Sequence, residues 1–271
     1  MTALKQLVSA VTLALAATCV NADAIHDAVK SEHRSADAKA RDEYRHPQQT
    51  LRFFGIEPGM KVVEVWPGGG WYTDILAPLL NDNGELVAAH FYVDETTNDY
   101  FKNALKKFNE RVASHPPYAD LTVTAFHPTK ALDMTEAGTA DAVLTFRNVH
   151  NWYMRHGDEG LSNAFGAFFK VLKPGGVLGV VEHEMPADGS DEHMKKSGYM
   201  KRDVVIAAAE AAGFTLADSS DVNANPRDDA DHPKGVWTLP PSLAMKDQDR
   251  ATYMAIGESN RMTLKFIKPE A

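Results

Sequence analysis

Short apolar runs alternate with longer amphipathic stretches along most of the chain. Helical periodicity predicts helices at residues 72–80, 97–113, 157–172 and 201–212. Runs rich in β-branched and aromatic residues predict strands at residues 60–65, 86–91, 121–125, 141–146, 177–182, 214–219 and 262–267. This alternation predicts a single α/β domain with a doubly wound, mostly parallel seven-stranded sheet, covered by helices on both faces. We expect the last two strands to form a hairpin at one edge, with one of them antiparallel.

A polar, alanine-rich extension, residues 25–56, precedes the first strand and is expected to be helical. Arg34, Arg41 and Arg45 are spaced among acidic residues, which is typical of an exposed helix with internal ion pairs. Gly55 is expected to close the last part of the extension in a left-handed cap. Two interpretations remain open: the extension is a surface helix, or it forms a lid over the site of the following domain.

The first 24 residues predict a secretory signal peptide. Lys5 supplies a positive start, and residues 7–20 form an apolar stretch too short to span a bilayer comfortably. Ala22-Asp23-Ala24 fits the small-x-small cleavage pattern. We therefore expect a periplasmic or secreted protein with a signal peptide at 1–24, a domain at 25–271, and no stable membrane association after cleavage. An uncleaved anchor is the alternative.

Composition narrows the classes of function. The chain has 271 residues, one cysteine and a formal net charge of −9. Because Cys19 lies in the predicted signal peptide, the mature chain has no thiol for a disulfide, for catalysis or for a metal. An acidic protein has no general attraction for nucleic acid or anionic membranes, so we expect a small-molecule substrate and no nucleic-acid partner. The sequence does not specify the oligomeric state.

An apolar strand runs directly into a glycine-rich turn and a helical pattern at residues 61–80, KVVEVWPGGGWYTDILAPLL. This arrangement lets backbone N–H groups and a helix N-terminus approach a nucleotide-like ligand closely. Glycine is needed because a Cβ would block the approach or forbid the backbone angles. A plain connection between strand and helix is the alternative. A second landmark, FGAFFKVLKPGGVLGVVEHE, lies at residues 165–184.

The order of these motifs resembles that of class I S-adenosylmethionine-dependent methyltransferases. Residues 63–70, VEVWPGGG, resemble their first motif, an apolar strand with an acidic residue followed by Gly-x-Gly-x-Gly. Residues 141–146 resemble the fourth strand, and LKPGG at 172–176 resembles the turn before the fifth. The WPGGGWYT form with a leading signal peptide resembles, more closely, a group of exported bacterial proteins predicted to be methyltransferases.

The resemblance implies a Rossmann-like methyltransferase fold and S-adenosylmethionine as the cofactor. Glu64 stands at the acidic place of the first motif, and Trp66 replaces its first glycine. His90 stands where the second strand usually ends in an acid that binds the ribose hydroxyls, and His127 stands where an acid often contacts adenine. The resemblance therefore assigns cofactor binding to Glu64, Trp66, Gly68, Gly70, His90 and His127.

The loops after the fourth and fifth strands are expected to carry the catalytic residues. In an open α/β sheet the reaction site lies beyond the carboxyl ends of the strands, where residues 147–153 and 182–184 are expected. His150 is our preferred general base and His183 the second candidate, because histidine ordinarily titrates near neutral pH. An ordinary hydrogen bond in a loop is the alternative for His150.

Three functions remain open at this point. The first is methyl transfer from S-adenosylmethionine to an unidentified small-molecule acceptor. The second is a methyltransferase-like periplasmic protein that binds a different ligand, which the predicted export and the missing acidic residues favour. The third is metal-assisted hydrolysis through His150, His183, Glu184 or His193. Since the spacing of these residues matches no tight metal motif, we assign no metal site.

Overall fold

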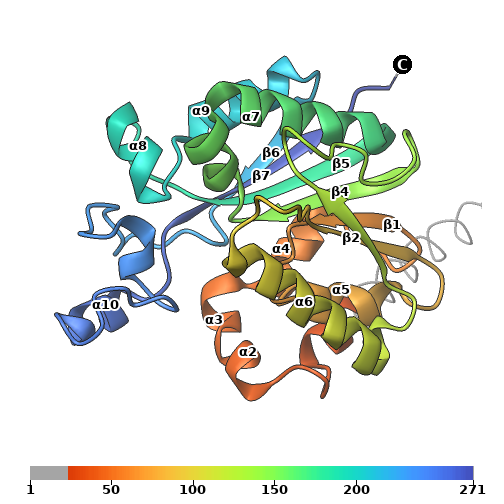
Figure 1. The fold of residues 1–271 in the computed structure, drawn as a ribbon, viewed down its shortest axis with the longest axis horizontal. Coiled ribbons are helices and arrows are strands. Elements are labelled where there is room, and N and C mark those ends of the chain that lie inside the picture. The colour runs from red at the N-terminus through yellow and green to blue at the C-terminus, as the bar shows by residue number, and fades with distance from the viewer. Residues whose placement is uncertain (1–23, 271) are drawn as a thin grey trace, which may run out of the picture.

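One seven-stranded sheet forms the centre of the molecule (Figure 1). The computed structural model describes residues 24–270, so the predicted signal peptide lies almost entirely outside the described residues. The strand order is β3-β2-β1-β4-β5-β7-β6. The strands are β1 (Lys61–Val65), β2 (Glu85–Phe91), β3 (Thr122–Phe126), β4 (Ala140–Phe146), β5 (Leu172–His183), β6 (Thr215–Ser220) and β7 (Arg261–Ile267).

The sheet is mixed. Strands β3, β2, β1, β4 and β5 pair in parallel, whereas β7 pairs antiparallel with both β5 and β6. The seven predicted strands are present, and the expected terminal hairpin is β6–β7. The parallel part therefore has the chain reversal between β1 and β4 at its centre, which is where this class of sheet places its ligand.

Helices cover both faces of the sheet (Figure 1). One face carries α7 (Val149–Val171) and α9 (Arg202–Ala211), and the other carries α4 (Pro47–Phe54), α5 (Thr73–Leu80) and α6 (Asp99–Ser114). Shorter helices are α2 (Ala36–Ala40), α3 (Asp42–Arg45), α8 (Asp191–Ser197) and α10 (Arg250–Ile256), with 3-10 turns at Pro116–Tyr118 and Gly235–Thr238. Residues 24–30 are also helical. Within the described part, no helix is both long and apolar enough to cross a membrane.

Apolar side chains pack against each face in two clusters. Phe168 of α7 belongs to one cluster and Phe54 of α4 to the other. Val63 and Val65 of β1 join the first cluster, while Val62, which points to the opposite face, joins the second. This alternation is the period of a strand buried on both faces, so β1 lies between the two cores and its carboxyl end is held rigidly.

The extension before β1 is not the single exposed helix that its charge pattern predicts. It forms several short helices, and the side chains of Arg34 and Arg45 are buried. Arg34 donates to both carboxylate oxygens of Asp42, at 3.0 and 2.6 Å, because a buried guanidinium must be paired. Gly55, with φ 77°, caps α4 as predicted. The extension therefore packs into the molecule.

Helix α7 begins earlier than the periodicity predicts. It starts at Val149, directly after β4, and is kinked at Gly157, whose φ and ψ are 57° and −147°. Residues 154–159 around the kink contain few apolar side chains, so the first two turns are separated from the helical pattern that follows. His150 consequently lies in the first turn of a helix rather than in a loop.

Candidate functional site

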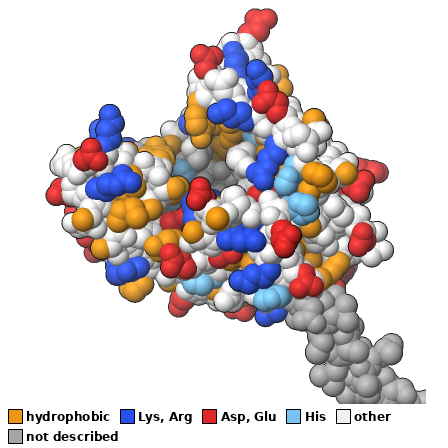
Figure 2. Space-filling model, turned by 90° about the horizontal axis from the view of Figure 1, so that it is seen from below, with side chains coloured by type: hydrophobic (Ala, Val, Ile, Leu, Met, Phe, Trp, Pro, Cys, Tyr) orange, Lys and Arg blue, Asp and Glu red, His pale blue; other side chains and the backbone are white. Residues whose placement is uncertain are grey.

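A cavity of about 960 Å³ opens beyond the carboxyl ends of β1, β4 and β5. Its walls come from α2 and α3, the glycine turn after β1, the first turn of α7, the end of β5, and segments 236–242 and 258–261. In the view from below, the surface is hollowed, with lysine and arginine side chains around the hollow (Figure 2). The cavity lies where the predicted catalytic and cofactor-binding segments were expected to meet.

The glycine turn presents one of its two predicted glycines to the cavity. Gly68 has φ 60°, lines the cavity, and has no atom within 4 Å of the place where a Cβ would stand. Gly70 has φ 84° but faces the protein, since a Cβ there would lie 2.7 Å from the hydroxyl of Tyr118. The expectation that a side chain at Gly70 would project into the site is therefore wrong.

Glu64 lies in the floor of the cavity, under the glycine turn. It is 2% exposed and accepts a hydrogen bond from Thr73 Oγ1 at 2.6 Å, which ties β1 to the start of α5. Burial raises the pKa of Glu64 to about 8. At neutral pH the group is therefore mostly protonated, and it offers the cavity a neutral carboxyl rather than a charge.

Trp66, at the place of the first family glycine, fills space that a glycine would leave open. Its backbone has φ 51°, a left-handed conformation that is strained for a bulky residue. Its Nε1 donates to the carbonyl of Phe126 at 2.8 Å, and its ring packs edge-on against Phe91 and Trp152. The indole therefore crosses the carboxyl ends of β2 and β3 and borders the cavity.

His90 does not face a ligand. It is fully buried and outside the lining of the cavity. Its Nδ1 accepts from the backbone N–H of Phe91 at 2.8 Å, so Nε2 carries the proton and donates to the carbonyl of Gly68 at 3.0 Å. Burial lowers the pKa of His90 to about 4, which keeps it neutral. The predicted ribose-binding role is corrected to that of a clamp on the glycine turn.

His127 lies in a side pocket of about 180 Å³ that adjoins the cavity. Trp66, Phe91, Phe101 and Arg155 line both spaces. The hydroxyl and amide side chains of Thr96, Thr97 and Asn98 and the ring of His156 complete the side pocket. It lies at the carboxyl ends of β2 and β3, and His127 directly follows β3.

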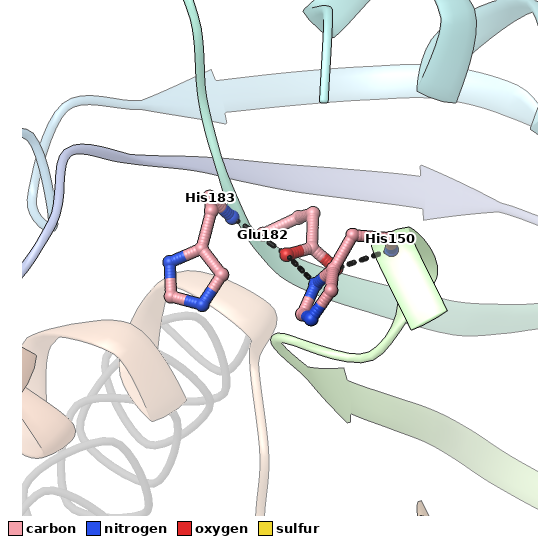
Figure 3. Close-up of side chains that lie close together, drawn as sticks. All are labelled: His150, Glu182 and His183. Atoms are coloured by element: carbon pink, nitrogen blue, oxygen red, sulfur yellow. Dashed lines mark hydrogen bonds and ion pairs between the residues drawn. The ribbon is translucent and has the colours of Figure 1, made fainter. Parts of the chain in front are cut away.

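A buried carboxylate joins the two predicted catalytic histidines (Figure 3). His150 Nδ1 lies 2.8 Å from Glu182 Oε1, and Glu182 also accepts the backbone N–H groups of His150 and His183 at 3.2 and 2.7 Å. Since the carboxylate accepts, Nδ1 of His150 carries the proton and Nε2 holds the lone pair. Asn151 Nδ2 donates to that Nε2 at 2.8 Å, at the cavity wall.

His183 is a poor proton acceptor. Burial, followed by the charges of His150 and Arg261, lowers its pKa well below the usual histidine value. Its Nδ1 is 2.5 Å from Ser259 Oγ. His183 therefore fits a neutral group that orients a ligand better than it fits a general base.

The histidines also form a potential metal-ligand set. Ligand atoms of His150, Glu182 and His183 lie within 4.8 Å of one another. The other two predicted ligands are elsewhere engaged, Glu184 by Arg202 at 2.6 Å and His193 by a backbone carbonyl at 2.9 Å. Arginine charges that lower the pKa of His183 equally oppose a divalent cation at this place, so the charge distribution does not favour metal-assisted hydrolysis.

Trp71 and Tyr72 attach the N-terminal extension to the glycine turn. The guanidiniums of Arg34 and Arg45 lie 5.0 and 4.6 Å from the centre of the Trp71 ring, and Trp71 Nε1 donates to the carbonyl of Ala38 at 3.1 Å. Tyr72 donates to the carbonyl of Arg45 at 3.2 Å. The extension thus covers one side of the cavity, which supports the lid interpretation over the surface helix.

Sequence reasoning missed an arginine cluster in the cavity. Arg41, Arg45, Arg147 and Arg261 all line it, and Glu258 lies among them. The available signals were the spacing of Arg41 and Arg45 in a polar extension, and the position of Arg147 directly after β4. Neither signal indicates that these residues meet, because their contacts are formed only in the folded chain.

Solved structures with the same fold include several methyltransferases. A SAM-dependent methyltransferase from Aquifex aeolicus is 16% identical, with a TM-score of 0.54, over 84% of this chain and 93% of that chain. A geranyl diphosphate methyltransferase in complex with SAM is 13% identical, with a TM-score of 0.54, over 90% of this chain and 94% of that chain. The [4+2]-cyclase SpnF is 16% identical, with a TM-score of 0.58, over 89% of this chain and 85% of that chain.

These likenesses concern the fold. No family model matches the sequence, and no curated protein matches it. Identities this low do not carry over substrates or catalytic residues. Together with the strand order, they show that the chain has the fold of class I S-adenosylmethionine-dependent methyltransferases.

Proposed function

We propose that the protein transfers a methyl group from S-adenosylmethionine to a small-molecule acceptor. The observation that carries this proposal is that one cavity brings together an open glycine wall and the buried His150–Glu182 pair. Methyl transfer requires a donor and an acceptor to be aligned, water to be excluded and a proton to be removed. The cavity offers groups for each of these tasks.

The residues of the cavity fit the cofactor, but the side chains that would contact it differ from those of the family pattern. Gly68 and Gly69 leave the wall beside β1 open to close approach of a ligand. The side pocket offers the aromatic ring of Trp66 and the polar side chains of Thr97 and Asn98, which suit a purine and its ribose. These groups would hold the adenosine end in place of the missing carboxylates.

The proton chemistry is assigned to His150. S-adenosylmethionine, when bound, supplies an electrophilic methyl group. Nε2 of His150 takes the proton of the acceptor's hydroxyl or amine, while the Nδ1–H bond to Glu182 fixes the tautomer and stabilises the imidazolium. The acceptor replaces the Asn151 amide at Nε2. The extension docked through Trp71 limits the access of water.

Isothermal titration with S-adenosylmethionine and S-adenosylhomocysteine tests the proposal. We expect saturable binding to wild type and its loss in Gly68→Val, whose side chain would stand on the open wall. Gly138→Val is the matched control, because Gly138 also has a positive φ of 68° and open space but lies outside the cavity lining. Absence of binding to wild type would contradict the proposal.

The second candidate function is the binding of a different ligand without methyl transfer. Trp66 favours it, because its indole crosses the strand ends where the family binds adenosine, and His90 offers no carboxylate there. The variant Trp66→Gly separates the two candidates. If S-adenosylmethionine binds this variant and not wild type, the tryptophan excludes the cofactor and the second candidate holds.

The proposed location is the periplasm or the exterior of the cell, with a small molecule as the only proposed partner. This rests on the N-terminal sequence and the acidic composition. Mass spectrometry of the exported protein should find a new N-terminus near Asp23 or Ile25. An intact N-terminus in the membrane fraction would favour the uncleaved anchor.

A further inference from the structure

Four arginines from separate parts of the chain meet on one wall of the cavity. Arg41 and Arg45 come from the N-terminal extension, Arg147 follows β4, and Arg261 begins β7. Glu258 is their shared partner: its carboxylate lies 2.6 Å from Arg41 Nε and 3.1 Å from Arg45 Nε, and it also contacts Arg261 Nη2. Burial raises the pKa of Glu258, but the arginines outweigh burial and lower it to about 2.

One carboxylate does not balance four guanidiniums. The other acids in the lining do not make up the difference: Glu64 is mostly protonated at neutral pH, Asp74 is engaged by Arg111 and Tyr118, and Asp37 is exposed at the rim. The chain as a whole carries a net charge of −9, so this positive wall is a local feature. Gathering like charges out of water opposes folding, which favours a functional reason for the cluster.

Arg147 is the member whose guanidinium is not engaged by the protein. No hydrogen bond or ion pair of its side chain is found within residues 24–270, although it lines the cavity. Desolvation and the neighbouring Arg261 lower its pKa to about 10. Its backbone is held at φ 62° by an N–H bond to the Val181 carbonyl at 2.7 Å. This strained conformation fixes the residue at the carboxyl end of β4.

Two neighbouring guanidiniums also have buried nitrogens without a partner. They are Nη2 of Arg41 and Nε of Arg261, a residue that is only 2% exposed. A buried donor that lacks an acceptor is costly, and a ligand with acceptor oxygens would satisfy it. Planar guanidiniums match carboxylate and phosphate oxygens in particular, since they offer parallel N–H groups.

We propose that this wall is an anion subsite, at which Arg147, supported by Arg41, Arg45 and Arg261, binds a carboxylate or phosphate group of a small-molecule ligand. The subsite adjoins His183, on whose pKa three of these arginines act. A ligand held there by its anionic group would therefore extend past the His150–Glu182 pair. The binding of an anion at this subsite does not depend on the proposed function. Only the identity of the ligand that carries the anion rests on that function.

Isothermal titration with inorganic phosphate and with succinate tests the subsite directly. At least one probe should bind wild type, and Arg147→Gln should weaken it by about tenfold or more, because a charge-assisted pair is lost. Arg250→Gln, on the exposed start of α10, makes the same change in net charge and should bind as wild type does. Binding of neither probe, or equal binding by both variants, would overturn the proposal.

Thermal unfolding separates a binding role from a structural one. Removing an unpaired charge that the fold disfavours should leave the melting temperature of Arg147→Gln unchanged or raised. A lower melting temperature together with unchanged phosphate and succinate affinity would assign Arg147 to folding alone and overturn the subsite.

Two adenosine compounds identify the source of the anion. If the subsite holds the carboxylate of the cofactor, phosphate should compete with S-adenosylhomocysteine but not with 5′-methylthioadenosine, which lacks the amino-acid end. If it holds an anionic acceptor, phosphate and S-adenosylhomocysteine should bind together. If neither adenosine compound binds while the Arg147-dependent probe does, methyl transfer fails and the anion subsite stands.

Discussion

The Nδ1 atom of His150 lies 2.8 Å from the carboxylate of Glu182, and both side chains are almost completely buried. One partner comes from the first turn of α7 and the other from the end of β5, so the pair joins two neighbouring strands at their carboxyl ends. The carboxylate also accepts two backbone N–H groups, which fix its orientation before any ligand binds. Such fixed geometry is what a general base requires.

Replacing Glu182 by Gln should change the tautomer of His150. The carboxylate can only accept, so it holds the proton on Nδ1, whereas an amide can also donate to Nδ1 and move the proton to Nε2. Nitrogen NMR of the ring should show Nδ1–H in wild type and a mixture or the other tautomer in the variant. An unchanged spectrum would contradict the assigned hydrogen bond.

Replacing His150 by Gln should lower the turnover of an identified acceptor by roughly 10²-fold or more, with little effect on cofactor affinity. The pH profile of the turnover should also differ from that of wild type in the same variant. His183→Gln is the comparison, since the low pKa of His183 makes it a poor proton acceptor. The effect of His183→Gln should appear mainly as a higher KM for the acceptor. If His150→Gln keeps its full rate, His150 is only part of the cavity wall.

Gly68 and Gly70 of the turn should separate stability from binding. Gly70→Ala places a methyl group 2.7 Å from the Tyr118 hydroxyl, at φ 84°, and should lower the free energy of unfolding by about 2–4 kcal/mol. Gly68→Ala meets no atom within 4 Å and should cost only about 1 kcal/mol, for its φ of 60°. Urea unfolding measures both. Loss of ligand binding with only a small loss of stability is expected for Gly68 substitutions only.

The strands and most of the helices could be predicted from the sequence because their signals are local. The β-branched apolar run of residues 61–65 and the glycines after it specify β1 and its turn within one short segment. The direction in which Gly70 faces could not be predicted in this way. It depends on Tyr118, which reaches the turn from the connection between α6 and β3.

The site was predicted in position but only partly in chemistry. His150 lies in the cavity as the topology predicts, since the carboxyl ends of β1, β4 and β5 converge. His90 lies near the end of the second strand, as the sequence predicts, but both of its ring nitrogens bind backbone groups and not a ligand. The arginine cluster escaped prediction because Arg45, Arg147 and Arg261 are brought together only by tertiary packing.

Glu64 should make the stability of the fold depend on pH. Burial raises its pKa in the folded protein from an ordinary 4.5 to about 8, so folding favours the protonated form. Its stabilising contribution is therefore fully present below pH 4.5 and is lost as the pH rises toward 8, at about 1.4 kcal/mol per pH unit. Glu64→Gln, which keeps an acceptor for Thr73, should flatten this slope and melt higher than wild type at pH 8.

The control for this slope is Glu85→Gln, an exposed acid at the start of β2 that pairs with Lys61 at 3.1 Å. Its ion pair is exposed to solvent, so the variant should keep the wild-type slope. The slope is measured from the melting temperatures of wild type, Glu64→Gln and Glu85→Gln between pH 5 and 8. Equal slopes for wild type and Glu64→Gln would show that another group is responsible.

Trp71 should hold the N-terminal extension over the cavity. Trp71→Ala removes the ring that Arg34 and Arg45 contact and the N–H bond to Ala38, and should cost about 2–4 kcal/mol of unfolding free energy. Trp71→Phe keeps a ring for the two guanidiniums and loses only the N–H bond, at about 1 kcal/mol. Limited proteolysis should then cut Trp71→Ala within residues 24–54 first, while the remaining chain stays resistant.

The same variant connects the lid to the anion subsite. When the extension is released, Arg41 and Arg45 leave the cavity wall together, whereas Arg147 stays at the end of β4. Phosphate or succinate should therefore bind Trp71→Ala more weakly than wild type, but more tightly than the double variant with Arg147→Gln. Trp71→Phe should bind the probes as wild type does. If Trp71→Ala instead resists proteolysis and retains full probe affinity, the extension is held by its other contacts and Trp71 does not control the lid.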